Sequence, residues 1–323
     1  MHHVFAYDWR RDLVESVRRL DETLEALADA RGDRHTRFNV VGHSMGGLIV
    51  RYYLRYGTAE PDPGAPVTWA GARRIRSLIL VAAPNGGSIP ALDGILLGNR
   101  VGLSYTTLSA RVVARMPAVY QVLPPAGASA LLDHRGEPLD ADLHDIATWE
   151  RFGWGPFGPT RKGGPEPGHP GDRVEPREFL AEVLRRARAF HRALTRIPAT
   201  PCPVRVIALG GDCMPTLARC MVPERPGLPP RFEPLSRHEA DAMFEAGDGR
   251  VTRASVLGSH VEGADESDTG SGYPEVSHAF FGSADHHGIY SEPTFQSLLL
   301  RRLLKPAPRP TLARVDSGAA AAS

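Results

Sequence analysis

The sequence is poor in cysteine. It has 3 cysteines among 323 residues, Cys202, Cys213 and Cys220. An odd number at irregular spacing fits neither a full disulfide framework nor a zinc site with paired ligands. A buried free thiol is the simplest interpretation. One bridge, from Cys213 to Cys220 or from Cys202 to either of them, stays open.

The sequence also lacks an excess of charge and any long apolar run. Lys and Arg number 38 and Asp and Glu 37, so the formal net charge is +1. A balanced chain has no long-range attraction to nucleic acid, and we expect no nucleic-acid partner. No stretch approaches the roughly 20 consecutive apolar residues of a membrane helix. We therefore expect a soluble protein without an integral membrane segment, whose contact with lipid surfaces would be peripheral.

Short apolar runs alternate with segments of helical periodicity. Hydrophobic residues make up 42% of the chain, enough for a large core. The pattern predicts strands at 4–7, 38–41, 75–83, 204–209 and 276–281, and helices at 11–31, 45–56, 178–194, 237–246 and 293–304. Strands alternating with helices indicate an α/β fold with a mostly parallel sheet flanked by helices.

The alternation stops in the middle of the chain, in a region that includes a long Gly- and Pro-rich stretch. A long insertion of this kind is usually functional. We divide the chain into a first part of the core (1–84), an inserted lobe (85–199), a second part of the core (200–304) and a disordered tail (305–323).

A serine lies in a sharp-turn motif. Residues 42–46 are Gly-His-Ser-Met-Gly, the pattern of a nucleophile elbow. The five-residue pattern alone is weak, but here a predicted strand ends directly before it and a predicted helix begins at Met45, as the elbow requires. Ser44 is therefore the candidate nucleophile.

A reactive serine needs a base to take its proton and a carboxylate to orient that base, in the order Ser, Asp or Glu, His. Asp248 lies between two glycines, where a turn can present its carboxylate. His286 and His287 lie between the last predicted strand and the last predicted helix. The order fits a catalytic triad.

Other residues fit the same roles less well. Asp212 and Asp241 are alternative acids, although turn or surface-helix roles suit them better. His43 is a poor base, because a neighbour of the elbow serine points the wrong way. Seven further histidines show no spacing that suggests a metal site: His134, His144, His169, His191, His238, His260 and His278. We expect no cofactor and no metal.

Five segments together resemble the lecithin:cholesterol acyltransferase family, in its bacterial branch of lipases and acyltransferases. They are residues 7–10 (YDWR), 42–47 (GHSMGG), 83–88 (APNGGS), 247–251 (GDGRV) and 285–289 (DHHGI). They occur in order and span nearly the whole chain. The resemblance implies an α/β-hydrolase fold, with Ser44 as the nucleophile, Asp248 as the acid and His286 as the base, with His287 as the alternative base. It also implies that residues 85–199 form a lid lobe.

The chain departs from the family at its beginning. Family members place a strand, a loop and a helix before the segment that matches residues 7–10, and that loop donates one N–H to the oxyanion hole. This chain opens at Met1, close to Tyr7, so we expect the N-terminal strands to be missing and the true start to lie upstream. The N–H of Met45 can supply one oxyanion donor. The compartment, cytoplasmic or exported, stays open.

These observations lead to three hypotheses. The first is a serine hydrolase or acyltransferase that acts on lipid-like carboxylic esters through an acyl-enzyme on Ser44. Apolar residues at the start of the lid lobe would cover its acyl pocket: Leu92, Ile95, Leu96, Leu97 and Val101. The second is a non-catalytic hydrolase-like scaffold that binds a lipid or a protein partner. The third is an amidase or peptidase that uses the same triad.

Overall fold

The computed structural model describes residues 2–100, 107–158, 174–258 and 275–304. The predicted tail at 305–323, Val101 and most of the Gly- and Pro-rich stretch lie outside the described residues.

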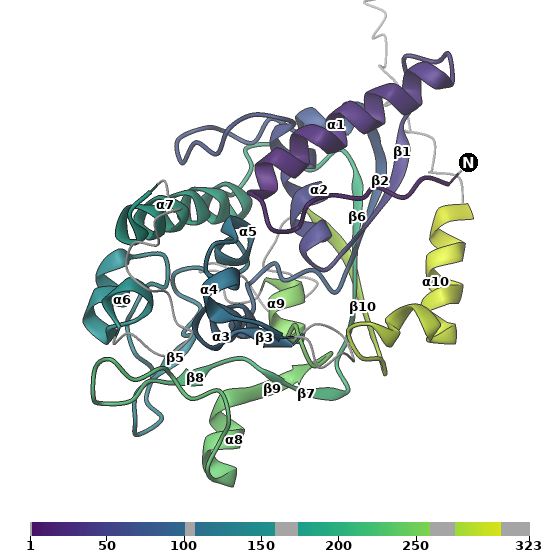
Figure 1. Ribbon diagram of the computed structural model, residues 1–323. Coiled ribbons are helices and arrows are strands. Elements are labelled where there is room, and N and C mark those ends of the chain that lie inside the picture. Colours follow the sequence, from purple (N-terminus) through teal and green to yellow (C-terminus); the bar gives the residue numbers. More distant parts are fainter. Residues whose placement is uncertain (1, 101–106, 159–173, 259–274, 305–323) are drawn as a thin grey trace, which may run out of the picture.

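A parallel sheet forms the centre of the molecule (Figure 1). Within the described residues it has four strands in the order β1-β2-β6-β10: β1 (Phe38–His43), β2 (Ile75–Val81), β6 (Arg205–Gly211) and β10 (Val276–Gly282). Side chains alternate between its two faces, so that Leu78 and Ile79 belong to different core clusters. The predicted mostly parallel sheet flanked by helices is confirmed.

Helices cover both faces of the sheet. On one face, α1 (Leu13–Ala30) packs against α2 (Met45–Tyr56), and both contribute to the largest core cluster. On the opposite face, α10 (Pro293–Leu304) packs through Phe295, which is 2% exposed. The sheet is therefore sandwiched, and its carboxyl ends carry the loops that a site can use.

A second core cluster lies in the region predicted to be an inserted lobe. The helices of this region lie beside the sheet (Figure 1). The cluster includes Trp149 and Trp154, which are 0% and 2% exposed and pack edge to face. The elements of this region are α3 (Ile89–Leu97), β3 (Asn99–Arg100), β4 (Thr107–Leu108), α4 (Ala110–Val113), α5 (Pro117–Tyr120), β5 (Leu131–Leu132), α6 (Ile146–Phe152) and α7 (Pro176–Thr195). The cluster also takes in Cys220 from β8 (Cys220–Met221), because β8 pairs with β5.

The remaining elements are short. They are α8 (Arg237–Met243), α9 (Arg253–Leu257), β7 (Met214–Leu217), β9 (Phe244–Gly247) and the 3₁₀ turns η1 (Ala70–Arg73), η2 (Gly155–Phe157) and η3 (Gly288–Ser291).

Two predicted elements differ from the structure. Residues 4–7 form no strand, and Phe5 and Tyr7 instead pack as partly buried side chains against the main core. A strand needs a neighbour for its backbone ladder, and in the described chain none pairs with these residues. The helix predicted at 237–246 ends at Met243, because the following residues pair with β7 as strand β9.

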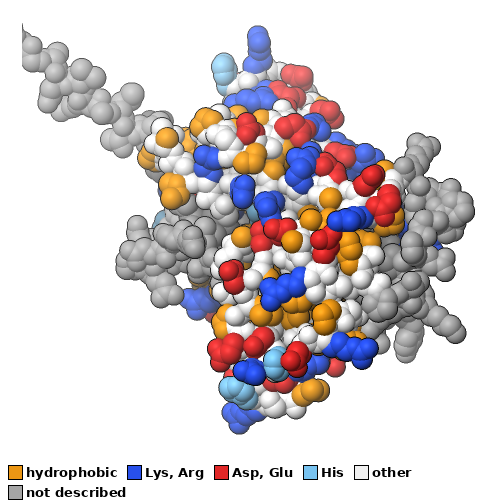
Figure 2. Space-filling view, turned by 90° about the vertical axis from the view of Figure 1, so that its left-hand side faces the viewer, with side chains coloured by type: hydrophobic (Ala, Val, Ile, Leu, Met, Phe, Trp, Pro, Cys, Tyr) orange, Lys and Arg blue, Asp and Glu red, His pale blue; other side chains and the backbone are white. Residues whose placement is uncertain are grey.

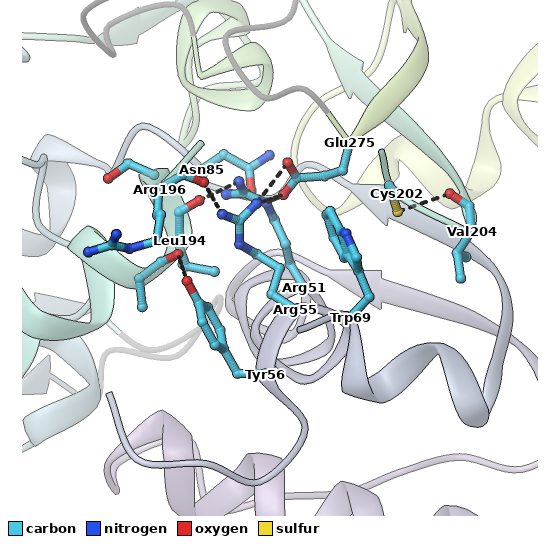
Figure 3. Close-up of polar contacts among 12 residues, drawn as sticks. Arg51, Arg55, Tyr56, Trp69, Asn85, Leu194, Arg196, Cys202, Val204 and Glu275 are labelled. Atoms are coloured by element: carbon cyan, nitrogen blue, oxygen red, sulfur yellow. Dashed lines mark hydrogen bonds and ion pairs between the residues drawn. The ribbon is translucent and has the colours of Figure 1, made fainter. Parts of the chain in front are cut away.

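A buried ion cluster fixes α2 to two distant segments (Figure 3). The guanidinium groups of Arg51 and Arg55 lie 2.5 Å and 3.0 Å from the carboxylate of Glu275, and all three side chains are 0% exposed. Arg51 also donates to the carbonyl of Leu194 at 2.8 Å, and Arg55 donates to the carbonyl of Arg196. The cations therefore also satisfy carbonyls at the C-terminal end of α7, where the helix dipole favours positive charge.

The surface carries both signs of charge. Figure 2 shows acidic and basic side chains interspersed over the face it presents, as the balanced composition predicts. Among the described residues, none of the helices has both the length and the apolar character to cross a bilayer.

Candidate active site

Ser44 lies in a strained backbone turn between β1 and α2. Its φ and ψ angles are 52° and −129°, in a region that non-glycine residues rarely adopt. Its backbone N–H donates to the carbonyl of Val81 on the neighbouring strand at 2.8 Å, which ties the turn to the sheet. Such a turn presents the serine hydroxyl at the edge of the sheet, away from the strand and the helix that hold it.

Two glycines make this turn sterically possible. A Cβ on Gly42 would lie 2.6 Å from the Val50 side chain, and one on Gly47 would lie 2.4 Å from the Cβ of Ala83. Gly46 is different, since the nearest atom to an added Cβ there would be 3.7 Å away. Close approach of strand and helix therefore requires glycine at positions 42 and 47 but not at position 46.

The structure brings Ser44, His286 and Asp248 into one hydrogen-bonded row. His286 Nε2 lies 3.0 Å from Ser44 Oγ, and His286 Nδ1 lies 2.8 Å from Asp248 Oδ2. A carboxylate only accepts hydrogen bonds, so Nδ1 carries the proton. Nε2 is then the lone-pair nitrogen of the neutral ring and accepts from the serine hydroxyl.

A tight turn after β9 orients the carboxylate of Asp248. Its Oδ1 accepts the backbone N–H groups of Arg250 and Val251 at 2.9 Å and 2.7 Å, as in an Asx turn. Gly249 adopts a φ of 88°, which favours glycine, and its N–H donates to Thr216 Oγ1 at 2.8 Å. With Oδ1 held in this way, Oδ2 is left facing His286, and the whole residue is only 1% exposed.

The alternative site residues lie elsewhere. His287 is exposed, and its ring contacts that of His286 with centroids 5.3 Å apart. Asp212 forms an ion pair with Arg253 at 3.6 Å, and Asp241 is exposed on α8. None of the three has a described hydrogen bond to His286 or Ser44.

Met45 is the first residue of α2. The N–H groups of the first helical turn have no acceptor within the helix, and the helix dipole makes this end positive. The N–H of Met45 belongs to this first turn and lies next to Ser44 in the chain.

His43 makes a contact that its place in the sequence does not predict. His43 Nε2 lies 3.1 Å from the backbone carbonyl oxygen of His286, and the two rings pack with centroids 4.9 Å apart. The only local signal was its position next to Ser44.

Asn85 is a second residue whose place the sequence did not predict. It is 0% exposed and donates through Nδ2 to the carbonyl of Val256 at 2.8 Å. The next residue, Gly86, donates to the carbonyl of Ser255 at 2.9 Å. The segment at 83–88 thus joins the end of β2 to α9, close behind the Asp248 turn.

A small hollow lies behind the Asp248 turn, next to Gly87, Ser88 and Arg250. Its volume of about 20 Å³ holds about one water molecule and is too small for an acyl chain. Of the residues predicted to cover such a chain, Leu92 is buried in the second core cluster and Leu97 is 48% exposed. The acyl pocket stays a prediction.

The other reactive side chains are dispersed. Within the described ranges, no group of three or more His, Cys, Asp or Glu side chains is arranged to hold a metal ion. Cys202, Cys213 and Cys220 all lie in described segments as free thiols.

The fold and the strand–elbow–helix turn are those of an α/β-hydrolase. The family model described as lecithin:cholesterol acyltransferase matches residues 3–147. The resemblance to that family, drawn from the five segments, is thereby confirmed over this part of the chain, which contains three of them.

A solved structure shows the same fold. A chain in the crystal structure of the Tle4–Tli4 complex aligns with a TM-score of 0.57 and 19% identity, over 90% of this chain and 66% of that chain. Bacillus licheniformis lipase BlEst2 in its mature form aligns with a TM-score of 0.37 and 12% identity, over 90% of this chain and 75% of that one. The chain thus spans just under two thirds of the first structure's length. A comparison with curated protein sequences gives no match.

Proposed function

We propose that the protein is a serine hydrolase or acyltransferase that acts on lipid-like carboxylic esters through an acyl-enzyme on Ser44. The family match supports lipid-like esters as the substrate class. The observation that carries the proposal is the row in which His286 lies 3.0 Å from Ser44 Oγ and 2.8 Å from Asp248 Oδ2. This is the arrangement by which a weak nucleophile is activated.

The first half of the reaction forms the acyl-enzyme. Ser44 Oγ attacks the ester carbonyl carbon while its proton passes to His286 Nε2. Asp248 stabilises the resulting imidazolium, and the N–H of Met45 donates to the oxyanion. The imidazolium then protonates the departing alkoxide as the carbon–oxygen bond to the alcohol breaks.

The second half releases the acyl group. Water or an acceptor alcohol gives a proton to His286 and attacks the acyl carbon, and Ser44 leaves with the proton that His286 returns. Water as acceptor gives a hydrolase, and an alcohol gives an acyltransferase.

The test compares wild type with Ser44→Ala on p-nitrophenyl esters of increasing acyl length, with and without an added long-chain alcohol. We expect Ser44→Ala to lower kcat by at least about 10³-fold. A fluorophosphonate probe should label the wild type and not the variant. Equal turnover by both proteins would overturn the proposal, and absence of labelling would favour the non-catalytic scaffold. Faster cleavage of matched amides than of esters would favour the amidase.

A further inference from the structure

His43 is held between two rings at the end of β1. Its ring centroid lies 4.9 Å from that of His286 on one side and 5.3 Å from that of Tyr290, edge to face, on the other. Tyr290 in turn packs edge to face against Phe295 of α10, with centroids 5.4 Å apart. The orientation of the His43 ring is thus fixed by His286 and by Tyr290 of η3, which begins two residues after His286.

The hydrogen bond of His43 defines its protonation. A backbone carbonyl only accepts, so the contact between His43 Nε2 and the carbonyl oxygen of His286 requires a proton on Nε2. Burial lowers the pKa of His43, and the nearby ring of His286 lowers it further. The hydrogen bond to the His286 carbonyl and the Asp248 carboxylate oppose this by smaller amounts, and His287 adds a small lowering. At neutral pH the ring is therefore uncharged, with its proton on Nε2 and the lone pair on Nδ1.

This contact completes the anchoring of the His286 backbone. The N–H of His286 donates to the backbone carbonyl of Asp248 at 2.9 Å, and its own carbonyl accepts from His43 at 3.1 Å. Both backbone polar groups of the residue are thus bound. One partner is Asp248, which also orients the His286 ring. The other is His43, which is joined to Ser44 by a peptide bond.

We propose, resting on the proposed function, that His43 is a positioning residue for the base, and that its Nε2–H···O=C bond to His286 keeps the imidazole in register with Ser44. Because His43 and Ser44 are consecutive, any movement of the elbow carries the anchor of the base with it. The distance between Nε2 of His286 and the serine oxygen is thereby held. An uncharged His43 also lets His286 accept a proton without a second cation against its ring.

The test uses two substitutions that differ in one donor. His43→Leu removes the hydrogen bond, and His43→Gln places an amide N–H₂ at a similar reach. We expect His43→Leu to lower kcat by about 10- to 100-fold, with KM within about twofold, because a misplaced base slows the chemical step rather than binding. His43→Gln should recover most of kcat. His278→Leu, an exposed histidine on β10, is the matched control and should behave as wild type.

Rescue by a donor separates positioning from a merely structural role. His43→Leu and His43→Gln both replace the ring, but only His43→Gln keeps a hydrogen-bond donor. Loss of packing alone would lower kcat to the same extent in both variants. Equal loss of kcat in both variants would therefore overturn the inference.

A measurement independent of turnover tests the same contact in the unaltered protein. Nitrogen-15 NMR of the histidine rings should show His43 with its proton on Nε2 at neutral pH. The Nδ1–H form would overturn the inference even in a fully active enzyme, and also if His43→Leu failed to fold. Equal turnover by wild type and Ser44→Ala would instead disprove the proposed function. The NMR measurement of the His43 tautomer would still test the hydrogen bond between His43 and His286.

Discussion

Asp248 binds His286 through both its side chain and its main chain. Its Oδ2 lies 2.8 Å from His286 Nδ1, and its backbone carbonyl accepts the backbone N–H of His286 at 2.9 Å. One residue therefore sets the position of the histidine and the orientation of its ring. Substitution of the carboxylate alone leaves the main-chain bond in place, which allows the two effects to be separated.

We predict that Asp248→Asn lowers kcat by about 10³- to 10⁴-fold without unfolding the protein. The two N–H groups of Arg250 and Val251 hold Oδ1, so an asparagine would keep its oxygen there and turn its N–H₂ toward His286. That donor favours the ring form with a bare Nδ1, whose Nε2–H cannot accept the serine proton. Kinetics on the p-nitrophenyl esters and circular dichroism check this.

The matched control is Asp212→Asn, which removes the alternative acid and its ion pair with Arg253. We expect its kcat to stay within about twofold of the wild-type value, since exposed ion pairs contribute little. A larger loss from Asp212→Asn than from Asp248→Asn would show that the wrong acid has been assigned.

A second prediction concerns the elbow glycines. Gly47→Ala should lower the free energy of unfolding by about 1–3 kcal/mol, because the new Cβ would lie 2.4 Å from the Cβ of Ala83. Gly46→Ala should be neutral or stabilising by up to about 1 kcal/mol, since its Cβ meets no atom closer than 3.7 Å and alanine favours the helix. Urea unfolding of the two variants measures both changes. Equal effects of the two substitutions would contradict the close approach of α2 to residue 83.

The sequence predicted those parts of the structure that depend on local signals. The helices at 45–56 and 293–304 were predicted with the bounds that the structure has, because a glycine-rich turn precedes the first and a proline begins the second. The strand at 4–7 was wrong, because a short apolar run becomes a strand only beside a neighbour. The predicted helix at 237–246 was too long for the same reason, since β9 exists only by pairing with β7.

Some residues of the candidate site have a local signal in the sequence and others do not. Ser44 has a motif, and Asp248 is flanked by glycines, so both are visible in the linear sequence. The choice between His286 and His287 came from the family resemblance. The hydrophobic pattern of the sequence cannot tell which of two adjacent side chains faces the serine. Contacts across long separations, such as Arg51 with Glu275 at 224 residues, leave no local pattern.

A third prediction tests that buried cluster. Glu275→Gln should lower the free energy of unfolding by about 3–5 kcal/mol, because it removes the buried negative charge that both Arg51 and Arg55 contact. Glu182→Gln, which breaks an exposed pair with Arg185, should change it by less than about 1 kcal/mol. Urea unfolding at neutral pH gives both values, and a similar small effect of both would contradict the buried pairing.

The same comparison should depend on pH. Burial acts to raise the pKa of Glu275, but the two guanidinium groups hold it below its ordinary value of 4.5. A carboxylate with a lowered folded-state pKa stabilises the protein above pH 4.5, and this contribution is lost as the pH falls through the folded value. The difference between wild type and Glu275→Gln should therefore shrink below about pH 4.5. A difference that grew on acidification would contradict the depressed pKa.

A fourth prediction concerns His191 of α7, which is 3% exposed. Within the described residues neither of its ring nitrogens makes a hydrogen bond of normal geometry, although backbone of Gln121 is near enough to interact. Burial, aided by the ring of His144, lowers its pKa from 6.5 to about 3. Between these values the unfolded chain binds a proton that the folded chain does not, so stability falls as the pH falls.

His191→Leu should remove this loss of stability at low pH. We expect the variant to be at least as stable as wild type at pH 8, because no strong hydrogen bond is broken. Its free energy of unfolding should also fall less steeply on acidification than that of wild type. The two slopes should differ by at most about 1.4 kcal/mol per pH unit. The exposed His238→Leu serves as the control. An acid dependence identical to that of wild type would show that His191 is not the group responsible.

The row at the active site joins positions 242 and 38 residues apart. On the ribosome, Ser44 emerges long before its partners have been translated. Under the proposed function the nascent polypeptide does not react with esters until residues through His286 have been synthesised and β10 has joined the sheet. Titration of the reactive serine with a covalent inhibitor would therefore count only molecules that extend beyond His286, and chains terminated before it would contribute nothing to the total.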